Sequence, residues 1–169
     1  MNFYPYTTAF TEVEVEPDGF DRTVALAKDV RSRKGRVFFI GNGGSAAIAS
    51  HMAIDWLNKA KISAFALNDP ASLTCLSNDY GYETVFSIPL MAHHFGENDL
   101  LFAISSSGKS RNLLKALPLD GKIVTLSGFD RENPLRLEGD INFYVPSYDY
   151  GVVETVHLGI LHTLLEALC

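Results

Sequence analysis

The stretch RVFFIGNGGSAAIASHMAID, residues 36–55, decides the fold of this chain. After Arg36 it continues with four apolar, mostly aromatic or β-branched residues, which indicate a strand buried on both faces of a parallel sheet. The loop Gly41–Ser45 follows, and its three glycines allow the backbone to turn tightly and to approach a ligand. Ser45 is placed to cap a helix that carries the rest of the stretch.

Four further apolar runs resemble this strand and are mostly separated by helical patterns. They are residues 62–67, 99–104, 122–126 and 141–145, while residues 20–33 and 152–168 have the apolar spacing or density of packed helices. Alternation of strand and helix implies a doubly wound sheet. We predict an α/β domain over residues 20–169, with a mainly five-stranded parallel sheet and helices on both faces. Residues 1–19 form an N-terminal arm, in which residues 11–16 suit a short edge strand or an extended segment.

The composition excludes several classes of partner. The 169 residues carry a net charge of −6 without a basic tract, which argues against nucleic acid as a partner. No apolar run approaches the roughly 20 residues of a membrane-spanning helix, so we expect no membrane association. The two cysteines have no spacing suited to a zinc site, and no secretory or transit signal is seen at the N-terminus, so we expect a cytoplasmic protein.

A second polar loop, Ser105–Ser110 with the sequence SSSGKS, follows another of the apolar runs. In open α/β sheets ligands bind beyond the carboxyl ends of the strands, so both loops should face one ligand. The hydroxyls and backbone N–H groups of the second loop, at a helix N-terminus, suit a phosphate monoester. Gly41, Gly43 and Ala46 also satisfy a dinucleotide fingerprint, but that reading leaves the second loop without a role, so we expect no nucleotide cofactor. The alternative is a purely structural role, in which both loops only form tight turns and helix caps.

Four blocks of sequence carry a resemblance to a known family: the chain resembles the sugar isomerase (SIS) domain proteins, and among them the bacterial phosphoheptose isomerases. The blocks are GNGGSAAIASHMAIDW from Gly41, LTCLSNDYGYETVFS from Leu73, LLFAISSSGKSRNLLKAL from Leu100 and VVETVHLGILHTLLEAL from Val152. The resemblance implies an SIS-type, flavodoxin-like fold and a homotetramer. It also implies isomerisation of sedoheptulose 7-phosphate to a heptose 7-phosphate through a metal-assisted enediol.

The resemblance also implies site residues. Substrate contacts fall on two loops and one dipeptide: Asn42, Gly43, Gly44, Asn78, Asp79, Ser105, Ser106, Ser107 and Ser110, to which the first loop adds Ser45. Zinc and catalytic positions fall on His51, Asp55, Glu154 and His162. The chain departs from the family in having Asp55 for Glu, Glu154 for Gln, Lys59 for Arg and Lys109 for Asn.

The spacing of these four residues carries its own prediction. His51 and Asp55 lie four residues apart on one helix face, so both can reach one metal, and two imidazoles with two carboxylates suit zinc or another divalent ion. Glu154 and His162 lie roughly 12 Å apart along their helix, at 1.5 Å per residue. Either their side chains reach toward each other from opposite ends of the site, or symmetry mates supply them separately. We favour the second, which predicts a homo-oligomer. Asp55, Glu154 and His162 are the expected catalytic residues, with Glu154 favoured as the base, whereas His157 is expected to pack inside the protein.

Two functions of different class remain. The first is an aldose–ketose isomerase acting on a phosphorylated sugar. The second is a non-catalytic SIS-domain protein that senses a sugar phosphate or docks a partner. Four candidate metal ligands beside a phosphate loop favour the enzyme, because a scaffold has no use for them.

Overall fold

The computed structural model describes residues 3–117 and 120–169. Its centre is one parallel sheet of five strands in the order β2-β1-β3-β4-β5. The strands are β1 (Arg36–Gly41), β2 (Ser63–Ala66), β3 (Leu100–Ser105), β4 (Lys122–Gly128) and β5 (Ile141–Val145). All five predicted strands are confirmed, with ends that differ by at most two residues.

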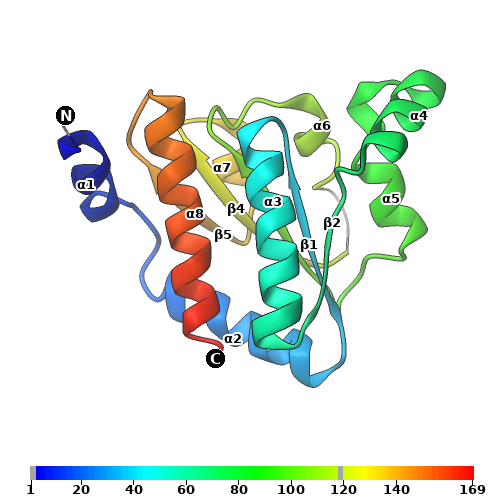
Figure 1. Cartoon of the computed structure of the whole chain (residues 1–169), viewed down its shortest axis with the longest axis horizontal. Coiled ribbons are helices and arrows are strands. Elements are labelled where there is room, and N and C mark those ends of the chain that lie inside the picture. Colours follow the sequence, from blue (N-terminus) through cyan, green and yellow to red (C-terminus); the bar gives the residue numbers. More distant parts are fainter. Residues whose placement is uncertain (1–2, 118–119) are drawn as a thin grey trace.

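Helices cover both faces of the sheet, as predicted for a doubly wound fold (Figure 1). One face is covered by α1 (Tyr4–Thr11), α2 (Gly19–Ser32), α3 (Gly44–Asp55) with its π-helical extension η1 (Trp56–Ala60), and α8 (Tyr150–Glu166). The other is covered by α5 (Ser87–Ala92), α6 (Arg111–Leu114) and α7 (Pro134–Glu138). Alternate residues of β1 belong to the two hydrophobic cores. Val37 and Phe39 pack under the first group of helices, and Phe38 and Ile40 pack under the second. No helix in the described ranges is long and apolar enough to cross a membrane.

One helix meets the packed layers only through partly buried side chains, Leu73 and Leu76. α4 (Pro70–Tyr80) has no buried residue and leads through the short 3-10 helix η2 (Tyr82–Thr84) into α5. Figure 1 shows α4 at the periphery of the molecule, beyond the edge strand β2. Its position matters for the site because it carries Asn78 and Asp79.

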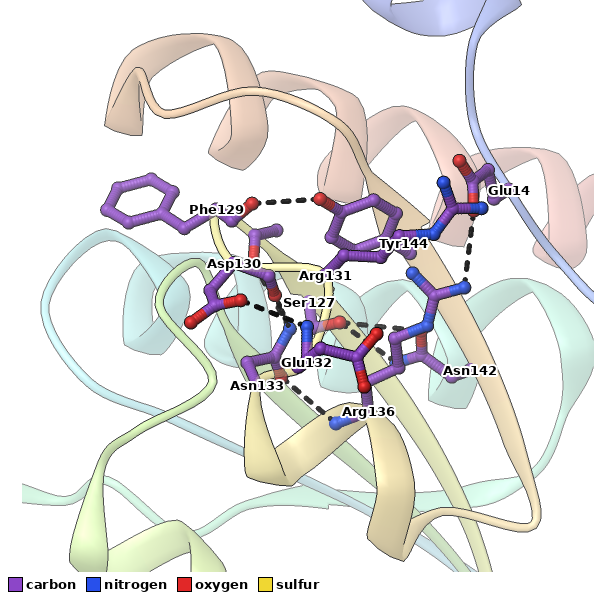
Figure 2. Close-up of polar contacts among 11 residues, drawn as sticks. Glu14, Ser127, Phe129, Asp130, Arg131, Glu132, Asn133, Arg136, Asn142 and Tyr144 are labelled. Atoms are coloured by element: carbon purple, nitrogen blue, oxygen red, sulfur yellow. Dashed lines mark hydrogen bonds and ion pairs between the residues drawn. The ribbon is translucent and has the colours of Figure 1, made fainter.

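The N-terminal arm is more ordered than an extended segment. Residues 4–11 form α1, which packs on α8, and the predicted edge strand reduces to one antiparallel bridge between Glu14 and Tyr144 of β5. The Glu14 carboxylate accepts from Arg131 at 2.6 Å and from Arg136 at 3.2 Å (Figure 2). Backbone pairing and this three-residue ion cluster together hold the arm against the edge strand, which reduces the edge that β5 leaves open.

The strand order places the candidate loops. The chain moves outward from β1 to β2 on one side of the sheet and from β3 to β4 and β5 on the other, so the order reverses between β1 and β3. Loops at the carboxyl ends of strands on either side of such a reversal form a crevice. The loops at 41–45 and 105–110 follow β1 and β3, the two strands at this reversal.

Candidate active site

The two predicted loops meet in one cleft of about 230 Å³ at the carboxyl ends of β1 and β3. The start of α8 closes its side. The lining residues are Asn42, Gly43, Gly44, Ser45, Ile104, Ser105, Ser106, Ser107, Ser110, Tyr150 and Glu154. The structure thus brings together all the predicted substrate contacts except Asn78 and Asp79.

The first loop owes its shape to two glycines. Gly43 has a φ of 56°, in the left-handed region that favours glycine, and it precedes the first residue of α3. A Cβ on Gly44 would overlap the carboxylate of Glu154, so glycine at this position leaves room for the acid in its present place beside the loop. The expected capping role of Ser45 is wrong: Gly43 is the N-cap, and no side chain caps the helix. Ser45 instead lies in the first turn, 3% exposed.

The hydroxyls of the second loop differ in their partners. Ser105 Oγ accepts from the backbone N–H of Gly108 at 3.2 Å, and Ser107 Oγ accepts from that of Lys109 at 3.4 Å. Ser106 is 4% exposed and its Oγ has no hydrogen-bond partner among the described residues. A buried polar atom without a partner costs stability unless a ligand supplies one.

The helix behind the second loop is shorter than expected. α6 has only four residues, so the partial charge that a helix dipole was expected to add there is small. The longer α3, with 12 residues, begins across the cleft at Gly44. Electrostatic support for an anion therefore comes from the first loop's helix more than from the second's.

Asn42 is held by neighbours that the sequence did not point to. Its Oδ1 accepts from Asn112 Nδ2 and from the hydroxyl of Tyr82, each at 2.9 Å, and its Nδ2 donates to Asn112 Oδ1 at 2.9 Å. Tyr150, one helical turn before Glu154, is a further lining residue missed by the sequence reasoning. Its spacing of four from Glu154 is the signal that would have found it.

Asn78 and Asp79 do not line the cleft. Both are exposed on α4, where Asn78 Nδ2 donates to Asp79 Oδ1 at 2.8 Å. Cys75, one turn earlier, lies with its sulfur 3.5 Å from Asp79 Oδ2, and this contact raises the pKa of the Cys75 thiol. The substrate-contact role of these two residues stays a prediction.

A group of potential metal ligands lies between α3 and α8. Within the described residues, ligand atoms of His51, Asp55 and His162 all lie within 4.8 Å of one another. Asp55 Oδ2 is 4.0 Å from both His51 Nε2 and His162 Nδ1. The side chains are partly accessible, with Asp55 18% and His51 51% exposed.

Lys59 is ion-paired with the carboxylate of this group. Its Nζ lies 2.9 Å from Asp55 Oδ2, and this hydrogen bond holds the pKa of the Asp55 carboxyl below its usual value, against the opposing effect of burial. The same contact raises the pKa of Lys59. Asp55 is therefore ionised at neutral pH, which is the state a metal ligand requires.

Glu154 is not part of that group in this chain. α3 and α8 lie side by side (Figure 1). Glu154 lies near Gly44 at the start of α3, and His162 lies near Asp55 at its end. Eight residues separate Glu154 from His162, or about 12 Å of helix. A single chain thus places the Glu154 carboxylate in the cleft and the His51–Asp55–His162 group about two turns of α8 away from it. We call these three residues the histidine–aspartate group.

His157 has the packing environment that the sequence analysis expected. It is fully buried, and its Nε2 lies 3.1 Å from the carbonyl oxygen of Ser127 at the end of β4. Its Nδ1 has no hydrogen-bond partner in the described part of the chain. Burial lowers the pKa of His157 to about 4, so the ring is neutral.

Comparison with known proteins places the chain in a family. A model of the SIS domain matches residues 6–119. The phosphoheptose isomerase of Colwellia psychrerythraea is 40% identical over 144 residues, 78% of this chain and 72% of that protein. That of Helicobacter pylori is 34% identical over 163 residues, 89% of this chain and 83% of that protein.

Solved structures agree with this placement. The structure of a phosphoheptose isomerase from Francisella tularensis superposes with a TM-score of 0.84 at 26% identity, covering 97% of this chain and 90% of that one. The phosphoheptose isomerase of Neisseria gonorrhoeae gives 0.82 at 28% identity, covering 90% and 86%. The chain belongs to the SIS domain family and, within it, to the family of the phosphoheptose isomerases.

Proposed function

We propose that this protein is a phosphoheptose isomerase, which converts sedoheptulose 7-phosphate into a heptose 7-phosphate through an enediol. The observation that carries the proposal is the cleft itself, where the unpartnered hydroxyl of Ser106 and the carboxylate of Glu154 line one small space. A hydroxyl that lacks a partner suits a phosphate oxygen, and a carboxylate suits proton abstraction. The relatives named phosphoheptose isomerase support the same assignment.

The phosphate is bound by the second loop in this proposal. Ser105, Ser106, Ser107 and Ser110 line the cleft, and exposed backbone N–H groups of the loop add further donors. The N-terminus of α3 faces the same space and favours negative charge. Asn78 and Asp79 are proposed to contact the sugar hydroxyls, which requires α4 to approach the cleft.

The histidine–aspartate group fits a divalent metal, most simply zinc. Two imidazoles and one carboxylate within 4.8 Å are the donor set of many catalytic zinc sites, which leave a position for substrate. Such an ion supplies Lewis acidity, which polarises sugar oxygens and stabilises negative charge on them. His51, Asp55 and His162 would hold it, and Lys59 keeps Asp55 ionised in readiness.

The chain's own residues move the protons. Glu154 removes a proton from C1 of the ketose and returns it to C2, so that the carbonyl passes from C2 to C1. His162 carries the accompanying proton between the two oxygens. Because Asp55 is held by Lys59, we assign the base to Glu154. The family usually has Gln at this position, so this base would be particular to this chain, and Glu154→Gln restores the family's residue while removing it.

We propose that the protein works as a homo-oligomer, a tetramer by its resemblance to the family. The distance between Glu154 and the histidine–aspartate group in one chain is the first support. The second is the outward face of α3 and η1, where Ile54 is 58% exposed and Leu57 47% exposed. A second copy packed there would bury apolar surface and bring groups of two chains to one substrate. The protein would act in the cytoplasm, because a charged sugar phosphate does not cross a bilayer unaided.

The test is turnover of sedoheptulose 7-phosphate, with metal content measured for each variant. We expect Glu154→Gln to lose at least about a hundredfold in kcat with metal retained, since general-base catalysis contributes on that scale. His51→Ala and Asp55→Asn should lose both turnover and metal. Glu166→Gln, at the exposed far end of α8, is the matched control and should keep both. Tight binding of the sugar phosphate without turnover by metal-loaded wild type would replace the isomerase by a sensor.

A further inference from the structure

The cleft offers a ligand one large apolar side chain. Among the described residues that line it, only Ile104 and Tyr150 carry large apolar groups, and the others are glycines, serines, Asn42 and Glu154. Ile104 is fully buried within β3, whereas Tyr150, the first residue of α8, is 59% exposed. The ring of Tyr150 is therefore the surface against which the carbon-bound hydrogens of a ligand can pack.

A second aromatic side chain holds this ring in place. The centroid of the Phe129 ring lies 4.7 Å from that of Tyr150, with an interplanar angle of 67°, which is a T-shaped contact. Phe129 is partly buried and packs against the hydrophobic core on the α8 side of the sheet. Because the contact restricts the Tyr150 ring before a ligand arrives, less side-chain entropy is lost on binding.

Phe129 occupies its place in a backbone conformation that is unusual for an aromatic residue. Its φ is 57°, in the left-handed region that disfavours bulky side chains. Its N–H donates to the Ser147 carbonyl at 3.0 Å, and its carbonyl accepts from the Tyr144 hydroxyl at 2.8 Å (Figure 2). Backbone strain that is held by surrounding contacts is concentrated at functional sites, which supports a role for this ring beside the cleft.

We propose that Tyr150 binds the carbon chain of the sugar, with Phe129 as the positioning residue that supports its ring. Tyr150 and Glu154 lie one helical turn apart and both line the cleft, so the ring is placed next to the acid that acts on the sugar carbons. The serines of the second loop bind the phosphate, and Tyr150 adds affinity only for a ligand that also has a carbon chain. This role rests on the proposed function, which supplies a sugar phosphate as the ligand.

The affinities for two ligands separate the carbon chain from the phosphate. Inorganic phosphate and sedoheptulose 7-phosphate are titrated calorimetrically into the protein supplied with zinc, after any conversion has reached equilibrium. Tyr150→Ala should weaken binding of the sugar phosphate about tenfold, the scale of one lost aromatic contact, and should leave that of inorganic phosphate unchanged. Tyr150→Phe keeps the ring and should keep both affinities.

Phe129→Gly tests the supporting ring. Glycine adopts the left-handed φ without strain, so the loop backbone is preserved while the ring is removed. Binding of the sugar phosphate should weaken in the same direction as in Tyr150→Ala, but less, and that of inorganic phosphate should not change. If the loss of core packing prevents this variant from folding, the two Tyr150 variants decide the question.

Tyr148→Ala is the matched control. Tyr148 is 74% exposed and stacks on the same Phe129 ring at 5.6 Å, but it does not line the cleft, so its removal should alter neither affinity. The proposal is overturned if Tyr150→Ala binds the sugar phosphate as tightly as the wild type, or loses inorganic phosphate equally. A lower mass of the assembly in Tyr150→Ala would also overturn it, because the ring would then belong to an interface between copies. A sugar phosphate that is bound through Tyr150 but not converted would count against the isomerase alone.

Discussion

At the scale of single residues, the site depends on which polar atoms lack partners. The hydroxyl oxygens of Ser105 and Ser107 accept from backbone N–H groups of their own loop, while the buried Ser106 hydroxyl has no partner among the residues that the structure describes. The sequence shows three adjacent serines and cannot distinguish them, because their hydrogen bonds depend on the turn that Gly108 makes with a φ of 63°. Of the three adjacent serines, Ser106 is therefore the one whose hydroxyl is left without a partner in the described part of the chain.

Replacing Ser106 by alanine should weaken ligand binding without harming the fold. We expect the affinity for sedoheptulose 7-phosphate to fall by about 10- to 100-fold, since a hydrogen bond to a charged group contributes about 1.5–3 kcal/mol. The free energy of unfolding should stay the same or rise slightly, because a buried group without a partner is removed. Calorimetric titration and urea unfolding measure the two quantities.

Ser87→Ala provides the control for this change. Ser87 is also buried, but its hydroxyl donates to the Thr84 carbonyl at 3.3 Å, away from the cleft. It should lower the free energy of unfolding by about 1 kcal/mol and leave affinity unchanged. Equal affinity of Ser106→Ala and wild type would show that the ligand does not use this hydroxyl.

The glycine at position 44 makes a second prediction at this scale. A methyl group there would displace the carboxylate of Glu154, which is the end of a side chain that can move. Gly44→Ala should therefore lower kcat by about tenfold or more, because a misplaced base loses its alignment, while metal content stays at the wild-type level. Wild-type kcat in this variant would argue that Glu154 is not the base.

At the scale of elements, the fold could be predicted further than the site. The five strands were found because each is an uninterrupted apolar run of the length that a buried parallel strand needs. His51 and Asp55 were correctly placed on one face because a helix brings residues four apart together. That His162 joins these two residues and Glu154 does not is decided by the packing of α3 against α8, which the spacing of residues along the sequence does not encode.

The other differences between the prediction from sequence and the structure also come from contacts between distant segments. α1 was missed although Pro5, in its first turn, is a typical helix-start signal, because eight residues of weak amphipathicity are stabilised mainly by packing on α8. Asn112 and Tyr82 gave no signal because their role lies in contacts with Asn42, 70 and 40 positions away. The short α6 could not be told from a longer helix by its apolar residues.

The attachment of α8 to β4 makes stability depend on pH. The His157 pKa is about 4 in the folded protein against an ordinary 6.5. Below pH 6.5 His157 becomes protonated in the unfolded chain but stays neutral in the folded protein. The free energy of unfolding should therefore fall between pH 6.5 and pH 4. Below pH 4 this contribution should become constant, because His157 is then protonated in both states. The loss amounts to about 3 kcal/mol. Urea unfolding at pH 7.5 and pH 4.5 measures it.

His157→Gln is the variant that isolates this effect. Glutamine keeps an N–H that can donate to the Ser127 carbonyl but does not titrate. The variant should lose most of the acid destabilisation between the two pH values. If the wild type and the variant weaken by the same amount, the acid sensitivity arises elsewhere.

At the scale of the whole molecule, the exposed apolar face of α3 and η1 predicts an assembly. Ile54→Glu with Leu57→Glu should reduce the oligomer to smaller species, because two charges would have to be buried in the interface. Activity should fall with assembly, since each site is proposed to draw on two copies. Light scattering and turnover, measured over the same concentration range, test both statements.

Met91→Glu is the matched surface change for the assembly. Met91 is 63% exposed, on α5 at the other face of the sheet, so its substitution should leave mass and activity unaltered. A fully active monomer of the Ile54→Glu, Leu57→Glu protein would show that one chain contains a complete site.

In the proposed reaction this protein moves a proton between adjacent carbons of a phosphorylated sugar. The most direct measurement is nuclear magnetic resonance of sedoheptulose 7-phosphate incubated in D₂O with the metal-loaded wild type and with Glu154→Gln. We expect a heptose 7-phosphate carrying solvent deuterium at C2 in the wild-type sample, because the Glu154 carboxyl exchanges its proton with solvent. With Glu154→Gln we expect neither product nor deuterium. Saturated binding of the sugar phosphate by the wild type, with no aldose and no deuterium at C1 or C2, would contradict it.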